Sequence, residues 1–271
     1  MLFRSANITL GQFLPGNSAV HRLDPRTKIL LMIVYIVIVF LVKALYVFAL
    51  PTLLLVLMFA LARVPGSYFF SSLKPMRWLL IFMFLINLFA TSGTTVLFRW
   101  HFIKITQEAL LQAVFFTLRL VLLVAGTSVL TLTTSPIALT DGLEKLLSPL
   151  RRLHFPAHEL AMMMTIALRF IPTLMEETDR IQKAQMARGA DFESGNIIQR
   201  AKSMIPILVP LFVSAFRRAD ELAMAMESRC YHGGEGRTRM RELHLHMGDL
   251  YAALFFALFT AGIVLLEKLP L

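Results

Sequence analysis

Cysteine and charge are both scarce in this chain. Its 271 residues include one cysteine, Cys230, which excludes an internal disulfide. Charged residues make up 16% of the chain and hydrophobic residues 57%. Soluble proteins average about 25% charged and roughly 45–50% apolar residues. This composition predicts an integral membrane protein and argues against a soluble domain.

Catalytic and cofactor-binding motifs are also missing. There is no Gly-x-x-x-x-Gly-Lys-Ser/Thr phosphate loop and no His-Glu-x-x-His zinc motif. His154 and His158 are separated by Pro156, and His244 and His246 are two residues apart, a spacing that faces apart on a helix. We therefore expect no metal, no cofactor and no catalytic residue, and hence a protein that is not an enzyme.

Acidic residues are outnumbered, with 17 Asp and Glu against 27 Lys and Arg and a net charge of +10. No nucleic-acid-binding motif accompanies this charge, so nucleic acid is not an expected partner. The better interpretation is that the cations hold loops against anionic lipid. Residues 1–20 have no continuous apolar core of the kind that a secretory signal needs, so we expect the first span to drive insertion.

Long apolar runs predict the membrane layout. Five spans are expected, an all-α fold, with about 20 residues needed per crossing. The runs cover 29–42, 44–62, 78–90, 109–132 and 250–266. Asp24 and Pro25 are suited to begin the first helix. The cations are biased towards the loops before the first and third spans, which predicts a cytoplasmic N-terminus and an outward C-terminus.

The chain therefore divides into three predicted parts: a membrane region (1–133), a cytoplasmic or interfacial region (134–247) and a final transmembrane helix (248–271). The middle part keeps apolar runs, Leu160–Leu168 and Met204–Phe216, that are too short to span. We expect a short amphipathic helix near 138–148 and two long proline-kinked helices over about 157–188 and 197–231. Arg119 interrupts the fourth span, and the favoured interpretation is a structural arginine satisfied in the bundle or facing water.

Two similar sequences close the two long helices. The first is Ala184-Gln185-Met186-Ala187-Arg188-Gly189, and the second is Ala225-Met226-Glu227-Ser228-Arg229-Cys230. Both read Ala-x-x-x-Arg. An alanine one turn before an arginine leaves a flat patch beside a forked donor, which would suit a partner's carboxylate or helix-end carbonyls. Ordinary helix ends also carry arginine followed by glycine, but the repetition favours docking.

These motifs resemble those of the transmembrane coupling component of energy-coupling factor (ECF) transporters, the EcfT/CbiQ family. The start His21-Arg22-Leu23-Asp24-Pro25-Arg26-Thr27-Lys28 is also similar to that family's N-terminal signature, and the likeness extends over essentially the whole chain. The resemblance implies a scaffold that joins two ATP-binding-cassette (ABC) ATPases to a separate membrane subunit, the S component, which binds a vitamin or a metal ion. It also implies a multi-pass protein of the cell membrane.

Residue roles follow from that resemblance. ATPase coupling falls to Ala184, Gln185, Ala187, Arg188, Gly189, Ala225, Ser228, Arg229 and Tyr231, with one arginine for each ATPase. The surface for the substrate subunit is expected on the apolar runs, at Met162, Met163, Met164, Ile207 and Leu211. The many methionines suit a surface that adapts to several partners, or they simply fill a core.

Two other functions remain open from the residues alone. A self-sufficient secondary transporter often has topology repeats and charges at the midplane of the membrane, of which only Arg119 is visible here. An intramembrane enzyme would need a polar catalytic cluster at membrane depth, and none is visible. The substrate itself is unreadable, because the expected ligand pocket belongs to another chain.

Overall fold

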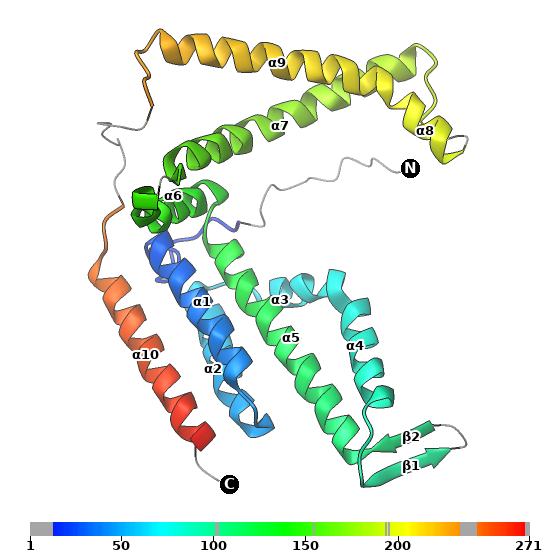
Figure 1. Cartoon of the computed structure of the whole chain (residues 1–271), viewed down its shortest axis with the longest axis vertical. Helices are drawn as coiled ribbons and strands as arrows, with labels where there is room; N and C mark the ends of the chain where they lie inside the picture. Colours follow the sequence, from blue (N-terminus) through cyan, green and yellow to red (C-terminus); the bar gives the residue numbers. More distant parts are fainter. Residues whose placement is uncertain are drawn as a thin grey trace. The chain divides into compact units, whose positions relative to one another are not determined.

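The structure is a computed structural model that describes residues 13–100, 103–153, 155–192, 194, 196–233 and 243–268. Its regular elements in these ranges are helices, apart from one two-stranded hairpin, which confirms the all-α expectation (Figure 1). The chain forms two compact units: residues 1–10 with 144–242, and residues 11–143 with 243–271. We call them the coupling unit and the membrane unit and describe each by itself.

The membrane unit contains helices long and apolar enough to cross a bilayer. Four such segments lie in the described residues: Leu45–Ala62, Gly66–Ala90, Gln107–Thr133 and Met247–Glu267. The second of them is divided by a short turn at Lys74–Met76. The remaining expected span, the first in the chain, is α1, Pro25–Leu41, whose 17 residues lie at the short end of the range that can cross. The elements are α1 (Pro25–Leu41), η1 (Leu45–Phe48), α2 (Ala49–Ala62), α3 (Gly66–Leu73), η2 (Lys74–Met76), α4 (Arg77–Ala90), β1 (Val96–Trp100), β2 (Ile103–Thr106), α5 (Gln107–Thr133) and α10 (Met247–Lys268).

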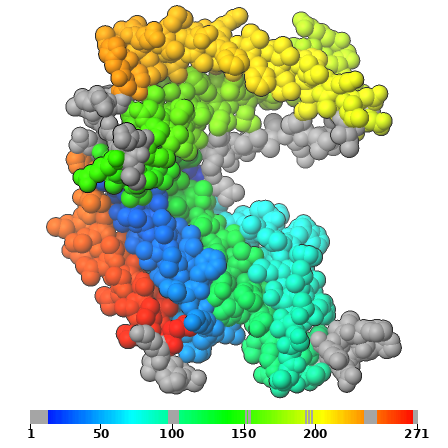
Figure 2. Space-filling model, viewed as in Figure 1, coloured from blue at the N-terminus to red at the C-terminus, as the bar shows by residue number. Residues whose placement is uncertain are grey.

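Helix α5 is the centre of the membrane unit, with α1, α2, α3 and α4 packed against it, while α10 lies along α1 (Figure 2). Close packing of α1 on α5 depends on Gly126, because a Cβ there would collide with the ring of Tyr35. The Tyr35 hydroxyl donates to the Leu122 carbonyl at 3.2 Å. The apolar core is therefore built around the α1–α5 contact.

Arg119 has a structural position within this core. Its guanidinium donates to the Val42 carbonyl, at the end of α1, at 2.5 Å, and it lies 4.5 Å from the Phe115 ring centroid. The Nε atom has no partner among the described residues. A cation at a helix C-terminus is stabilising, so Arg119 closes α1 inside the bundle.

The coupling unit consists of the end of α6 (Pro136–Leu147), η3 (Ser148–Leu153), α7 (Ala157–Ala187), α8 (Ile197–Ser203) and α9 (Ile205–Glu227). Pro172 lies inside α7 without ending it, and Pro210 lies inside α9. The helix expected over 197–231 is divided at Met204, because Pro206 has no amide hydrogen and starts a new helix in its first turn.

Candidate functional site: two matched helix ends

The last turn of α7 closes in a left-handed cap. The amide of Gly189 donates to the Met186 carbonyl at 3.0 Å, and the amide of Ala190 donates to the Gln185 carbonyl at 3.0 Å. Gly189 has φ +86°, a left-handed value that suits glycine. This pair of bonds is the Schellman motif, and it makes Arg188 the last residue before the chain reverses.

The end of α9 repeats the same hydrogen bonds. The amide of Cys230 donates to the Glu227 carbonyl at 2.8 Å, and the amide of Tyr231 donates to the Met226 carbonyl at 3.1 Å. Cys230 has φ +56° and takes the place that Gly189 has in the first motif. Arg229 therefore occupies the same position in its cap as Arg188 does in its own.

Both arginines lie exposed at the ends of their helices. Neither guanidinium has an ion-pair or hydrogen-bond partner among the residues that the structure describes. Ala184 and Ala225, each one turn earlier, are exposed as well. The Ser228 hydroxyl donates back to the Ala225 carbonyl at 3.1 Å, so it leaves the surface beside Arg229 flat. We call the segments 184–190 and 225–231 the two tips.

Of the remaining predicted tip residues, Ala187 and Gly189 are exposed, whereas Gln185 and Tyr231 are half-buried. Gln185 contributes its carbonyl to the first cap, and Tyr231 contributes its amide to the second. Together with Gly189, these two predicted residues shape the backbone of the tips.

Helices α7 and α9 pack against each other in opposite directions. The Gln185 amide, near the end of α7, lies 3.4 Å from the Pro206 carbonyl, near the start of α9. Further along, the Arg218 guanidinium contacts the Glu177 carboxylate at 2.7 Å. Because the partners' order is reversed along the two helices, the tips lie at opposite ends of the pair. Arg229 follows Pro206 by 23 residues, an axial distance of about 35 Å along α9.

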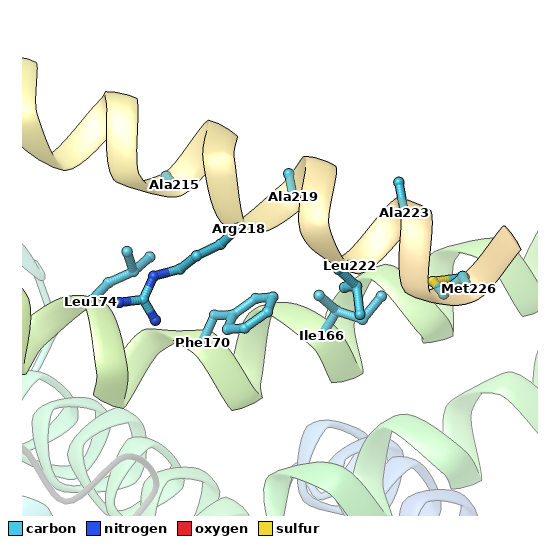
Figure 3. A pocket seen from close by; sticks show the side chains of 9 residues that line it. All are labelled: Ile166, Phe170, Leu174, Ala215, Arg218, Ala219, Leu222, Ala223 and Met226. Atoms are coloured by element: carbon cyan, nitrogen blue, oxygen red, sulfur yellow. The ribbon is translucent and has the colours of Figure 1, made fainter. Parts of the chain in front are cut away.

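The contact between these helices is loose beyond the ion pair. A hollow of about 310 Å³ opens between them (Figure 3). On α7 it is lined by Ile166, Phe170 and Leu174, and on α9 by Ala215, Arg218, Ala219, Leu222, Ala223 and Met226. Figure 3 shows Leu222 of α9 beside Ile166 of α7, whereas Ala219 and Ala223 are exposed, so the packing around the hollow is open on one side.

An exposed apolar face runs along the first half of α9. Its members recur at helical spacing, so they form one continuous stripe. They are Ile205, Leu208, Val209, Phe212, Val213 and Phe216, with side chains between 46% and 68% exposed. On α7, Met163 and Met164 are exposed and Met162 is half-buried. Ile207, by contrast, is buried and Leu211 is half-buried, so these two lie off the exposed stripe.

Among the described residues, no three His, Cys, Asp or Glu side chains gather in a way that could hold a metal ion. His158 and Glu144 form a pair at 3.0 Å within the coupling unit. His154 and residues 234–242, which include the basic run at 237–241, lie outside the described residues.

The fold defines a class: a polytopic all-α membrane protein with a helical coupling unit that ends in two cationic tips. The cobalt transport protein family, CbiQ, matches residues 16–240. Relatives named "Energy-coupling factor transporter transmembrane protein EcfT" occur in Thermosediminibacter oceani (55% identical over 258 residues, 95% of this chain and 97% of that protein) and in Bacillus subtilis (52% over 237 residues, 88% and 89%). Another, from Clostridium kluyveri, is 55% identical over 249 residues, 92% of each chain. The chain therefore belongs to the CbiQ family of energy-coupling factor transporter transmembrane components.

This membership agrees with a transporter component that is not itself an enzyme. The sequence had located the two tips, but it missed the Glu177–Arg218 pair. The sequence shows charges of opposite sign on the two long helices, but it does not show which residue of one helix lies opposite which residue of the other.

Proposed function

We propose that this protein is the mechanical link of an ATP-driven importer. Two ABC ATPases bind the tips, Arg188 engaging one and Arg229 the other. A separate membrane subunit binds the cargo, a vitamin or a metal ion, and packs on the apolar surface of the coupling helices. The single observation that carries this proposal is the repetition of one cap geometry at both ends of an antiparallel helix pair, each with an exposed arginine that has no partner among the described residues.

The geometry of the tips supports two separate docking partners. A partner that covered both tips would have to reach along most of α9, about 35 Å. Each tip presents a forked donor beside an exposed alanine, which is suited to a carboxylate in a groove of the partner. The cation bias of the loops supports an orientation with the N-terminus and the tips in the cytoplasm, where ATP is available.

The link works through the connected helices in this proposal. When ATP draws the two ATPases together, each pulls on one tip and the pair α7–α9 changes its crossing geometry. The Glu177–Arg218 contact keeps the helices joined, and the loose packing around the hollow lets them move. The exposed stripe of α9 with Met163 and Met164 then transmits the change to the cargo-binding subunit.

Charge reversal tests the tips directly. Arg188→Glu and Arg229→Glu, singly and together, are expressed with both ATPases and a tagged cargo subunit, and the complex is captured through the tag. We expect each single change to weaken ATPase capture and the double change to abolish it, with the cargo subunit still bound. Exposed arginines on the same helices, Arg180→Glu and Arg217→Glu, serve as matched controls and should leave capture intact. Normal ATPase stoichiometry in the double variant would refute the assignment.

A further inference from the structure

The chain bends sharply where α3 meets α4. Helix α3 ends at Leu73, the short turn η2 covers Lys74–Met76, and α4 begins at Arg77. Pro75 lies in the turn and removes a backbone donor. Figure 1 shows α3 lying across the end of α4 within the membrane unit. The bend places residues 70–80 at the junction of a transverse helix and an apolar one.

Two cations stand at this bend without a counter-charge. Lys74 and Arg77 are three residues apart, are both exposed, and have no ion-pair partner among the described residues. The sequence offers no acid nearby, since residues 25–107 contain no aspartate or glutamate. Neutralisation of this pair must therefore come from outside the segment.

Apolar and aromatic side chains surround the two cations, as is expected where a protein contacts lipid headgroups. Lys74 and Arg77 line a shallow hollow of about 370 Å³ together with Phe70, Ser71, Leu73 and Leu80. The exposed side chain of Trp78 follows at once, 5.6 Å from the Arg77 guanidinium to the ring centroid. Tryptophan beside cations at the end of an apolar helix is typical of the membrane–water interface.

We propose that this hollow binds the headgroup of an anionic phospholipid. The Arg77 guanidinium and the Lys74 ammonium pair with the phosphate, and the Ser71 hydroxyl is placed to donate to it. Phe70, Leu73 and Leu80 supply an apolar wall for the first part of an acyl chain. The site is independent of ATPase docking, because it uses no residue of either tip.

Tryptophan fluorescence can detect the lipid. The chain has two tryptophans, so Trp100→Phe leaves Trp78 as the sole emitter. The full chain is placed in bilayers of phosphatidylcholine and phosphatidylglycerol in which either lipid carries bromine, a quencher. Each Lys or Arg near an anionic surface attracts anionic lipid by about 1 kcal/mol, which corresponds to about a fivefold change in how often that lipid occupies the site. We expect brominated phosphatidylglycerol to quench Trp78 severalfold more than brominated phosphatidylcholine at equal mole fraction.

Variants separate the site from general charge. Lys74→Gln with Arg77→Gln should make the two lipids quench equally. Arg180→Gln with Lys183→Gln removes an exposed pair of the same spacing from α7 and should leave the preference unchanged. Ser71→Glu keeps both cations but supplies a competing carboxylate, so it should also abolish the preference. This variant tests the site if the double variant does not fold.

Two outcomes would overturn the proposal. The first is equal quenching in the unmodified protein, or a preference that survives both changes at the bend. The second is a loss of preference caused by inorganic phosphate but not by chloride at the same ionic strength, which would assign the cations to a soluble anion. If phosphate and chloride reduce the preference equally, the reduction comes from screening of the charges, and this result supports a lipid headgroup.

Discussion

The two arginines at the tips are made equivalent by backbone geometry and not by the residues that follow them. Both precede a residue with positive φ, but one is Gly189 and the other Cys230. A left-handed conformation costs a residue with a Cβ about 1–2 kcal/mol, whereas glycine adopts it freely. The backbone at Cys230 is therefore strained in the second tip, whereas the backbone at Gly189 in the first tip is not.

This difference predicts opposite effects of two substitutions. Cys230→Gly should strengthen the cap of α9 by about 1 kcal/mol, and Gly189→Ala should weaken the cap of α7 by a similar amount. A Cβ at Gly189 would meet no atom within 4 Å, so the second effect comes from the backbone alone. Amide hydrogen exchange at Tyr231 and Ala190 measures both, with about a fivefold change in protection for each kcal/mol. Unchanged exchange at both positions would contradict the strain argument.

At the scale of elements, one ion pair adds to the apolar contacts and the Gln185–Pro206 hydrogen bond that join α7 to α9. The Glu177 and Arg218 side chains are 24% and 32% exposed, so solvent screens the pair only partly. Glu177→Ala or Arg218→Ala should each loosen the helices, and the coupling energy of the pair should be about 0.5–1 kcal/mol. A double-mutant cycle on thermal unfolding of the detergent-solubilised protein measures it.

Reversal of the pair distinguishes this contact from general packing. Glu177→Arg with Arg218→Glu should restore most of the stability that either reversal alone removes. Glu176→Arg with Arg217→Glu, which alters neighbouring exposed charges, is the matched comparison and should show no such recovery. Additive losses in the first double variant would mean that the two side chains do not stabilise the helix pair together.

Much of the helical layout was predictable because apolar length and helix-start residues act locally. Asp24 does accept a hydrogen bond from the Arg26 amide at the start of α1, and α7 spans the expected residues despite Pro172. The short helix expected near 138–148 is observed at Pro136–Leu147. These features depend on residues within one or two turns, so the sequence is sufficient.

The exposed face of α9 was not predictable in the same way. The run Met204–Phe216 is largely apolar all round, so no periodicity tells which side packs on α7. Ile207 is buried although its neighbours Leu208 and Val209 are exposed, which the composition of the run does not indicate. The hairpin of β1 and β2 was also missed, because no element was predicted between the third and fourth apolar runs. In both cases tertiary contacts decide, and these lie beyond the local pattern.

At the scale of the whole membrane unit, a buried polar cluster joins the start of α1 to the start of α10. The Asp24 amide donates to the Asp249 carboxylate at 2.8 Å, across 225 residues. The Lys28 ammonium donates to the Thr133 carbonyl at 3.0 Å, at the end of α5. Because Asp24, Lys28 and Asp249 are all buried, loss of one partner leaves the others unsatisfied. The cluster therefore fixes the ends of α1, α5 and α10 together.

Asp24 makes this cluster sensitive to acid. Burial raises the pKa of its carboxyl group, but hydrogen bonds from the Arg26 side chain and amide outweigh burial and hold the pKa below its ordinary value. The folded protein therefore binds fewer protons than the unfolded chain in the acid range. The stabilisation by Asp24 is complete above the ordinary pKa of about 4 and is lost as pH falls through the lowered value.

Asp24→Asn should consequently lower the melting temperature at neutral pH, and the gap to the unmodified protein should narrow as pH falls towards about 3. Asparagine remains an acceptable helix cap, so the variant tests the charge and not the cap. Thermal unfolding in detergent across this pH range measures the gap, and subtraction of the two curves removes the titration of every other carboxylate. A constant gap would show that the Asp24 charge does not stabilise the junction of α1 with α10.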